Sequence, residues 1–285
     1  MKKVDFRWLI QGGILCILAF ALSHTGSALA DGLKRDVPTS AKQLQLRGFE
    51  PTAEGISRAL TNEFPWTVVY AIRTIRDQNT GSFAPELTKL LTHERARVRV
   101  EAAQALATLG DSHGEAAIRE EVKKGSETVA KLKQAHVAPG YWTSDDLKAW
   151  VEAAGMLVKD GDPRGFNLVK AAVENEKLGA QVQAARILSE FVRFKAEGIE
   201  VLPVLLRAAD QCLGKVNARM ERDPAKDHGA GNAALRFIVH GLKQVGGKEA
   251  EAKLEEIARC KSRSVSFSAK TALRAMGKDT STLPE

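Results

Sequence analysis

Along the chain, apolar and small residues recur at intervals of three or four positions within short segments. The clearest segment runs from Val98 to Asp111, with such residues at positions 98, 102, 103, 105, 106 and 109. This spacing predicts an amphipathic helix. Gly110 follows the last of them and predicts the end of the helix, because glycine readily adopts the left-handed conformation of a helix C-terminus.

The same pattern returns five more times, in segments 71–75, 151–162, 182–188, 238–246 and 269–277. We call the first small or apolar residue of each copy its reference residue. The reference residues are Ala71, Ala102, Ala153, Ala184, Ile238 and Ala269. Successive gaps are 31, 51, 31, 54 and 31 residues, which indicates a period of 31 with insertions near 125–146 and 212–231. An internal repeat of this length is typical of stacked supersecondary units.

A second amphipathic segment precedes most copies, as at 85–91, 165–173, 199–209 and 250–258. Each unit is therefore expected to be a helix–turn–helix that buries its apolar face only by stacking on its neighbours. The sequence predicts an all-α fold of about six helical hairpins. Insertions in such arrays usually form loops at one edge, so we expect both insertions to project as loops.

These segments resemble the HEAT-repeat superfamily, in particular the short repeats of about 30 residues found in phycobilin lyases. The resemblance covers residues 49–277 and implies an α-solenoid. Residues 31–48 would then be a linker or N-terminal cap, and 278–285 a flexible tail. The superfamily consists chiefly of binding scaffolds. Its metal-dependent hydroxylases place His-Glu pairs just before the reference position, where this chain has Val100 and Glu101, so that activity is not implied.

Residues 1–30 have the three parts of a signal peptide. Lys2, Lys3 and Arg7 form a positive start, an apolar stretch covers residues 8–22, and Ala28-Leu-Ala30 is a small-x-small cleavage site. A stretch of 15 residues is short for a membrane span, which needs about 20. We expect cleavage after Ala30, export to the periplasm or beyond, and no stable membrane span in the mature chain.

Composition narrows the partner class. The chain has a formal charge of +7, of which residues 1–30 hold +2, so residues 31–285 carry +5. The basic residues are spread out without a Lys/Arg run, whereas nucleic-acid binding usually needs a concentrated basic face. Aromatic residues make up only 6% of the chain, which suits closely packed helices better than a β-sandwich. We expect a protein or peptide partner and no nucleic acid.

Signatures of catalysis and of common cofactors are lacking. The sequence contains no P-loop, no GxGxxG, no HExxH and no GxSxG, and we expect no cofactor. The alternative to a scaffold is an enzyme or a metal-dependent binding protein centred on the second insertion. Its candidate residues are Asp223, Asp227, His228 and His240. Arg222 and Lys226 lie among them, which favours a solvated turn over a metal site.

Two cysteines follow the leader, Cys212 and Cys260. An oxidising compartment would permit a disulfide between them. The alternative is two unpaired thiols, because the repeat register places the residues about one turn out of step.

The repeat register also predicts a partner-binding face. In HEAT solenoids the second helix of each hairpin lines the concave side, and the positions one before and two after each reference residue face outward together. We predict a contact set from these positions: Tyr70, Arg73, Glu101, Gln104, Glu152, Arg186, Phe237 and His240. Tyr and Arg side chains supply much of the binding energy at interfaces, and the mixed charges suit a polypeptide. Our hypothesis is a noncatalytic scaffold.

Overall fold

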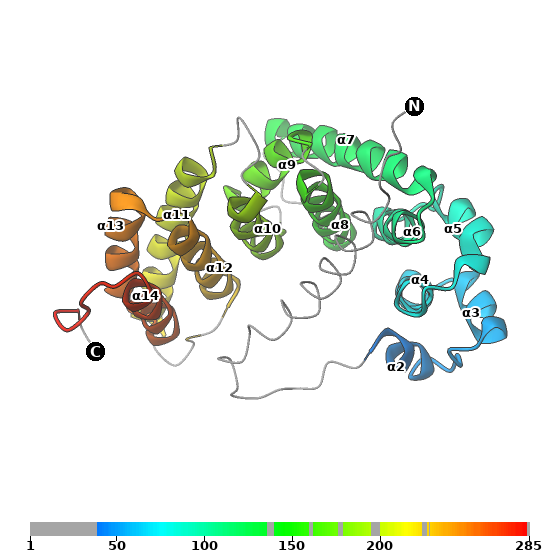
Figure 1. Ribbon diagram of the computed structural model, residues 1–285, viewed down its shortest axis with the longest axis horizontal. Helices are drawn as coiled ribbons and strands as arrows, with labels where there is room; N and C mark the ends of the chain where they lie inside the picture. Colours follow the sequence, from blue (N-terminus) through cyan, green and yellow to red (C-terminus); the bar gives the residue numbers. More distant parts are fainter. Residues whose placement is uncertain are drawn as a thin grey trace, which may run out of the picture. The chain divides into compact units, whose positions relative to one another are not determined.

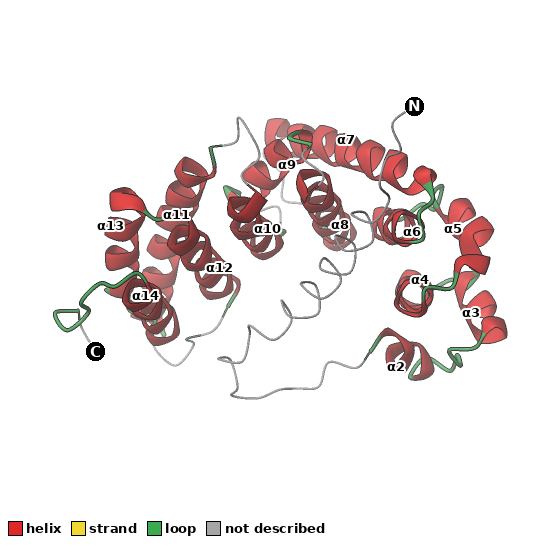
Figure 2. Cartoon of the chain, in the orientation of Figure 1, coloured by secondary structure: helices red, strands yellow, loops and turns green. Residues whose placement is uncertain are grey.

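The computed structural model describes residues 39–135, 140–159, 162–175, 179–194, 200–223, 227 and 229–283. Every regular element in these residues is a helix, as Figure 2 shows. The predicted all-α class is confirmed. The expected signal peptide, residues 1–30, lies outside the described residues.

The described chain contains thirteen α-helices, which we group by their odd or even number along the chain (Figure 1). The odd-numbered helices are α3 (Ala53–Leu60), α5 (Ala84–Leu90), α7 (Ser112–Ala135), α9 (Arg164–Val173), α11 (Val201–Arg222) and α13 (Gly247–Ala258). The even-numbered helices are α2 (Ser40–Gln45), α4 (Pro65–Gln78), α6 (Ala96–Thr108), α8 (Tyr141–Lys159), α10 (Gln181–Phe194), α12 (Ala230–Val245) and α14 (Arg263–Ala275). A short 3₁₀ helix, η1 (Gly81–Phe83), leads into α5.

The even-numbered helices form one layer. Each contacts the next even-numbered helix, from α2 through α14, while α3, α5, α7, α9, α11 and α13 each contact the helix that follows them in the chain. All six reference residues lie in helices of this layer, from α4 to α14, and are 0% exposed. The repeat read from the sequence therefore corresponds to a repeated packing position, occupied by a small or branched apolar side chain.

Local sequence sets the ends of these helices. Thr52 and Ser262 accept hydrogen bonds from the backbone of Gly55 and Val265, which caps the first turns of α3 and α14. Pro65 starts α4, where its missing N–H costs nothing. Gly110 has φ of +81°, so the predicted left-handed end of α6 is confirmed.

Two glycines bring successive hairpins close together. A Cβ on Gly114 would lie 2.4 Å from the backbone nitrogen of Ala107, and one on Gly165 would lie 2.4 Å from the backbone oxygen of Ala154. Each glycine lies twelve residues after a reference residue, in the first turn of the next odd-numbered helix. The close approach of α7 to α6 is thus repeated where α9 meets α8.

Both insertions lengthen helices, so the expected projecting loops are a wrong prediction for the residues described. Residues 125–135 continue α7, which is 24 residues long, and residues 212–222 continue α11, which is 22 long. Buried positions extend into both, at Val129 in α7 and at Val216 and Met220 in α11. Both helices continue into the insertions because the inserted residues keep apolar side chains at helical spacing.

The two ends of the repeat region are packed rather than free. Leu44 of α2 is buried against α4. Beyond α14, the Nε of Arg274 donates to the hydroxyl of Thr280 at 2.7 Å, and both Thr280 and Leu283 are buried. Residues 278–283, which were expected to belong to a flexible tail, therefore contact the last hairpin through Thr280 and Leu283.

The buried core has two clusters that meet at α6. Val98, Ala102 and Leu106 belong to the cluster that includes α2 to α5, whereas Val100 and Ala103 belong to the cluster that runs on to α14. Opposite faces of one helix therefore join the two parts of the core.

A buried carboxylate links α6, α7 and α8. Glu121 is 3% exposed and accepts hydrogen bonds from the Arg99 guanidinium at 2.7 and 2.8 Å, and from the Trp150 indole at 2.8 Å. Burial raises the pKa of Glu121, but these bonds outweigh it, and the pKa lies below its ordinary value of 4.5. A charge that would be costly alone is thereby paired and fully hydrogen-bonded.

No helix in the described part of the chain is both long and apolar enough to cross a membrane.

Candidate functional site

The eight predicted contact residues fall into two groups in the even-numbered layer. Those from α4, α6 and α8 take part in contacts with neighbouring helices, whereas those from α10 and α12 line a groove. The first group is Tyr70, Arg73, Glu101, Gln104 and Glu152; the second is Arg186, Phe237 and His240.

Glu101 is the centre of the first group. Its side chain is 2% exposed, although the repeat register predicted an outward position. The Nε of Arg73 donates to its carboxylate at 3.0 Å, and Arg76 reaches the other oxygen at 3.5 Å. Burial lowers the pKa of Arg73, but the hydrogen bond to Glu101 and the negative charges of Glu101 and Glu152 together outweigh it, and the pKa lies above its ordinary value. The expectation that Glu101 is an exposed contact is wrong, because the Arg73 and Arg76 side chains of α4 pair with its carboxylate.

Arg97, which the sequence analysis did not single out, extends these contacts to α8. Its guanidinium lies 2.5 Å from the Glu152 carboxylate and 3.9 Å from that of Glu101. It also lies 3.7 Å from Asp145 near the start of α8. We call Arg73, Arg76, Arg97, Glu101 and Glu152 the polar network. It joins three successive even-numbered helices.

Gln104 and Tyr70 are also partnered within the chain. The side-chain oxygen of Gln104 accepts a hydrogen bond from Arg76 at 3.2 Å. Tyr70 is half-buried, with the Arg47 guanidinium 4.4 Å from its ring centroid and the Trp66 ring 6.0 Å away. Each of the five predicted residues of the first group therefore contacts other residues of the chain.

Arg186, Phe237 and His240 are brought together in a groove between α10 and α12, with a volume of about 510 Å³. We call it the α10–α12 groove. It is lined by Arg186, Ser189, Glu190, Ala233, Arg236, Phe237 and His240. Gly241 lets α12 approach α10 closely, since a Cβ there would lie 3.3 Å from the Cα of Ser189.

The groove combines charge of both signs with an aromatic surface. The Arg186 guanidinium lies 2.7 Å from the Glu190 carboxylate. A nitrogen of the His240 ring lies 2.6 Å from the Gln244 side-chain amide. Phe237 is half-buried, while Arg236 is exposed and forms no ion pair among the described residues. The site therefore offers an apolar surface beside a cation.

Two residues of this region were missed by the sequence analysis. Arg236 lies two positions before the reference residue Ile238, and Phe267 of α14 lies two positions before Ala269. The analysis considered only the positions one before and two after. Phe267 is 67% exposed in the structure, an exposure that the sequence alone does not show.

The alternative site at the second insertion is not assembled by the described residues. The Asp227 carboxylate accepts hydrogen bonds from the side chain of Asn232 at 3.0 Å and from the backbone of Ser264 at 3.2 Å, which ties α12 to α14. His240 lies eight residues beyond Asn232, about 12 Å along the helix. Asp223 follows the last residue of α11, and His228 lies outside the described residues. No group of three or more potential ligands gathers in the described part of the chain.

Cys212 in α11 and Cys260 after α13 are both buried, and no disulfide joins them in this structure. Burial raises the pKa of Cys260, which makes its thiol less reactive.

Comparisons with known proteins do not assign the chain to a family. No protein-family model matches it, and no curated protein sequence matches it.

Proposed function

We propose that the chain is a noncatalytic scaffold that binds a segment of a protein or peptide partner in the α10–α12 groove. The observation that carries this proposal is the convergence of Arg186, Phe237 and His240, three residues selected from the repeat register, on one groove. Its volume of about 510 Å³ falls within the range of binding pockets.

The proposal includes the architecture inferred from the repeat. In it, the six helix pairs from α3/α4 to α13/α14 stack as a HEAT-like solenoid, with the even-numbered layer on the concave side. The buried reference residues and the contacts between successive even-numbered helices support this arrangement.

The lining of the groove favours a polypeptide over a polyanion. Glu190 lines the groove beside Arg186 and would repel a chain of phosphates. Phe237 offers an apolar contact, and Arg236 offers an exposed guanidinium that can pair with a carboxylate. A short segment with an acidic residue next to an apolar one matches these features. The proposed setting is the periplasm or the cell exterior, after cleavage of the leader at Ala30.

Selection from a displayed random-peptide library tests this proposal. The purified protein is the bait, and the selected peptides are then measured against two variants by fluorescence anisotropy. Arg236→Glu reverses the charge of an exposed groove residue, and His240→Ala removes a side chain at its edge. We expect the peptides to share an acidic residue near an apolar one, and Arg236→Glu to weaken binding at least tenfold.

Two controls separate binding from stability. Arg259→Glu changes an exposed arginine after α13, outside the groove, and should leave peptide affinity unchanged. Arg73→Gln weakens the polar network and should lower the free energy of unfolding while leaving affinity within twofold. Peptides that bind Arg236→Glu and His240→Ala as tightly as the unaltered protein would contradict the placement.

A further inference from the structure

Three exposed residues of α12 are matched, 31 positions later, by three exposed residues of α14. The pairs are Arg236 and Phe267, His240 and Thr271, and Lys243 and Arg274. Both sets keep the same offsets from the buried reference residues of their helices, and α14 packs against α12 (Figure 1). The two rows therefore lie side by side on one face of the even-numbered layer. We call these six residues the α12–α14 surface.

Neither helix of this surface carries a negative side chain. α12 and α14, which are described in full, contain no aspartate or glutamate but five lysines and arginines. Arg236 and Lys243 are exposed and form no ion pair in the described part of the chain. α10, on the other side of the groove, has one acidic residue, Glu190, which pairs with Arg186. The positive charge of the surface is therefore available to a partner.

The neighbouring odd-numbered helices differ, because acidic residues there pair with cations. Lys253 of α13 lies 2.6 Å from Asp210 of α11 and 2.5 Å from Glu256. Lys261, which follows α13, lies 2.5 Å from Glu221 of α11. The α12–α14 surface lacks such acidic neighbours on its own helices.

Phe267 places an apolar ring on the same surface, where it is 67% exposed. Single exposed apolar residues are common, so the position of the ring decides what it indicates. Phe267 holds the position equivalent to Arg236, which lines the α10–α12 groove beside Phe237. The surface thus continues the groove from α12 to α14, with an aromatic ring on each of the two helices.

We propose that the partner segment bound in the α10–α12 groove continues over α14, and that it is an acidic stretch with two large apolar side chains three residues apart. Packed helices lie about 8–10 Å apart and an extended chain advances about 3.3 Å per residue, so about three residues lead from α12 to α14. Carboxylates of the segment pair with Arg236 and Lys243, and its apolar side chains contact Phe237 and Phe267. This inference rests on the proposed function, because the segment enters from the groove.

The same chemistry favours a peptide over an anionic membrane. Phe237 is half-buried in the groove, so a flat layer of lipid headgroups that contacts Phe267 does not also contact Phe237. Glu190, which lines the groove, would repel anionic headgroups at that end. A narrow acidic segment avoids both difficulties.

Fluorescence anisotropy with three labelled heptapeptides tests the proposal at physiological salt. The acidic phenylalanine peptide is Asp-Phe-Glu-Asp-Phe-Glu-Asp, which has the proposed spacing of rings. The neutral peptide replaces Asp by Asn and Glu by Gln, and the ring-free peptide replaces Phe by Ala. We expect a Kd of about 10–100 µM for the acidic phenylalanine peptide, and binding at least about tenfold weaker for the other two.

Two variants of the surface show which contact each part of the peptide makes. Phe267→Ala should weaken the acidic phenylalanine peptide about fivefold and leave the ring-free peptide unchanged. Lys243→Glu should weaken the acidic phenylalanine peptide at least about tenfold and leave the neutral peptide unchanged. A merely structural effect of either substitution would alter the binding of all three peptides alike.

Lys248→Glu is the matched control, because it makes the same charge change at an exposed lysine of α13. It should leave the affinity for every peptide within about twofold, since charges far apart on the surface are screened by salt. Phe267 and Lys243 are exposed, so all three variants should keep the helical circular dichroism of the unaltered protein.

The outcomes separate this inference from the groove proposal. Peptides that Arg236→Glu and His240→Ala weaken, but Phe267→Ala and Lys243→Glu do not, would overturn the extension over α14 and leave the groove in place. Indifference to Arg236→Glu and His240→Ala would instead contradict the groove itself. Sedimentation with vesicles of equal parts phosphatidylcholine and phosphatidylglycerol should recover no protein. Recovery that Phe267→Ala abolishes would overturn the peptide in favour of a membrane.

Discussion

At the scale of single residues, buried charged side chains form more contacts between helices than the sequence suggested. Glu101 and Glu121 are the two most deeply buried carboxylates of the described chain, and each receives arginine side chains from the same or a neighbouring helix. The repeat register predicted an outward position for Glu101 but could not reveal that Arg73, Arg76 and Arg97 surround its carboxylate. Arg97 reaches Glu152 across 55 positions of sequence, a pairing that no local pattern encodes.

Replacement of Glu121 by Gln should lower the free energy of unfolding by about 3–5 kcal/mol, because the Arg99 side chain, which is only 14% exposed, would lose its counter-charge. Denaturant titration measures this loss. The matched control is Glu120→Gln, the neighbouring exposed glutamate, which should change stability by about 0.5 kcal/mol or less. Equal effects of the two substitutions would show that the Arg99–Glu121 pair contributes nothing.

The pH dependence of stability has a defined sign at the same residue. The pKa of Glu121 in the folded protein lies below its ordinary value of 4.5, so its ionised form stabilises the fold. That contribution is complete above pH 4.5 and is lost as the pH falls through the lower folded pKa. The stability difference between the unaltered protein and Glu121→Gln should therefore shrink as the pH drops below 4.5, as denaturant titrations at several pH values would measure. A constant difference down to pH 2 would contradict this explanation.

At the scale of helices, the sequence predicted most of the second helix of each hairpin and missed the extent of several first helices. The reference residues identified α4, α6, α8, α10, α12 and α14 because a buried face leaves a strong period. The extensions of α7 and α11 were taken for loops because they broke the repeat length, although residues such as Val129 and Val216 kept helical spacing. Repeat length was the weaker of the two signals.

Close packing between successive hairpins depends on Gly114 and Gly165. An alanine at either position would place Cβ 2.4 Å from backbone of the preceding helix, so each substitution should cost about 1–3 kcal/mol as the helices separate. Gly214→Ala is the control: this glycine lies in α11 with nothing within 4 Å of a Cβ, and alanine there should stabilise by about 0.5–1 kcal/mol. Thermal unfolding of the three variants measures these changes in stability, which should be losses for Gly114→Ala and Gly165→Ala and a gain for Gly214→Ala. Stabilisation by Gly114→Ala would contradict the close approach.

At the scale of the whole molecule, the two core clusters meet at α6 and should respond separately to change. Val98→Ala removes buried methyl groups from the cluster of α2 to α5, whereas Val100→Ala removes them from the cluster that continues to α14. Each should cost about 2 kcal/mol. Hydrogen exchange should show reduced protection mainly in α3–α5 for Val98→Ala and mainly in α7–α9 for Val100→Ala. Identical protection maps would indicate a single cooperative unit instead.

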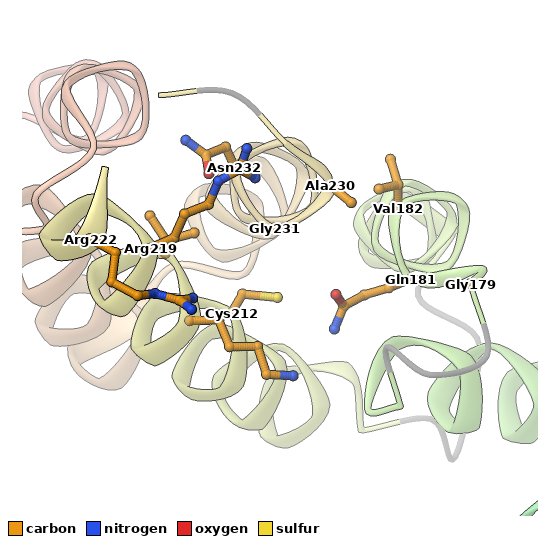
Figure 3. A pocket seen from close by; sticks show the side chains of 11 residues that line it. Gly179, Gln181, Val182, Cys212, Arg219, Arg222, Ala230, Gly231 and Asn232 are labelled. Carbon is orange, nitrogen blue, oxygen red and sulfur yellow. The ribbon is translucent and has the colours of Figure 1, made fainter. Parts of the chain in front are cut away.

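The candidate site was predicted only in part, because contacts between distant parts of the chain cannot be read from the repeat. Outward positions could be read from the repeat, and three of them line the α10–α12 groove. The remaining five contact residues from other parts of the chain, such as Arg47 of the segment after α2 and Arg97 of α6. A second cavity, lined in part by Arg219 and Arg222 of α11 (Figure 3), was missed altogether, because it depends on the helical extension of α11 that had been read as a loop.

The central claim, that a polypeptide occupies the α10–α12 groove, is tested most directly by site-specific photo-crosslinking. A photoreactive phenylalanine analogue replaces His240 at the groove or, as a control, exposed Gln211 on α11, and the protein is irradiated with a peptide selected on the unaltered chain. We predict a covalent product from position 240 that excess unlabelled peptide suppresses, and none from position 211. Equal products from both positions, or a product from 211 alone, would contradict the proposed site.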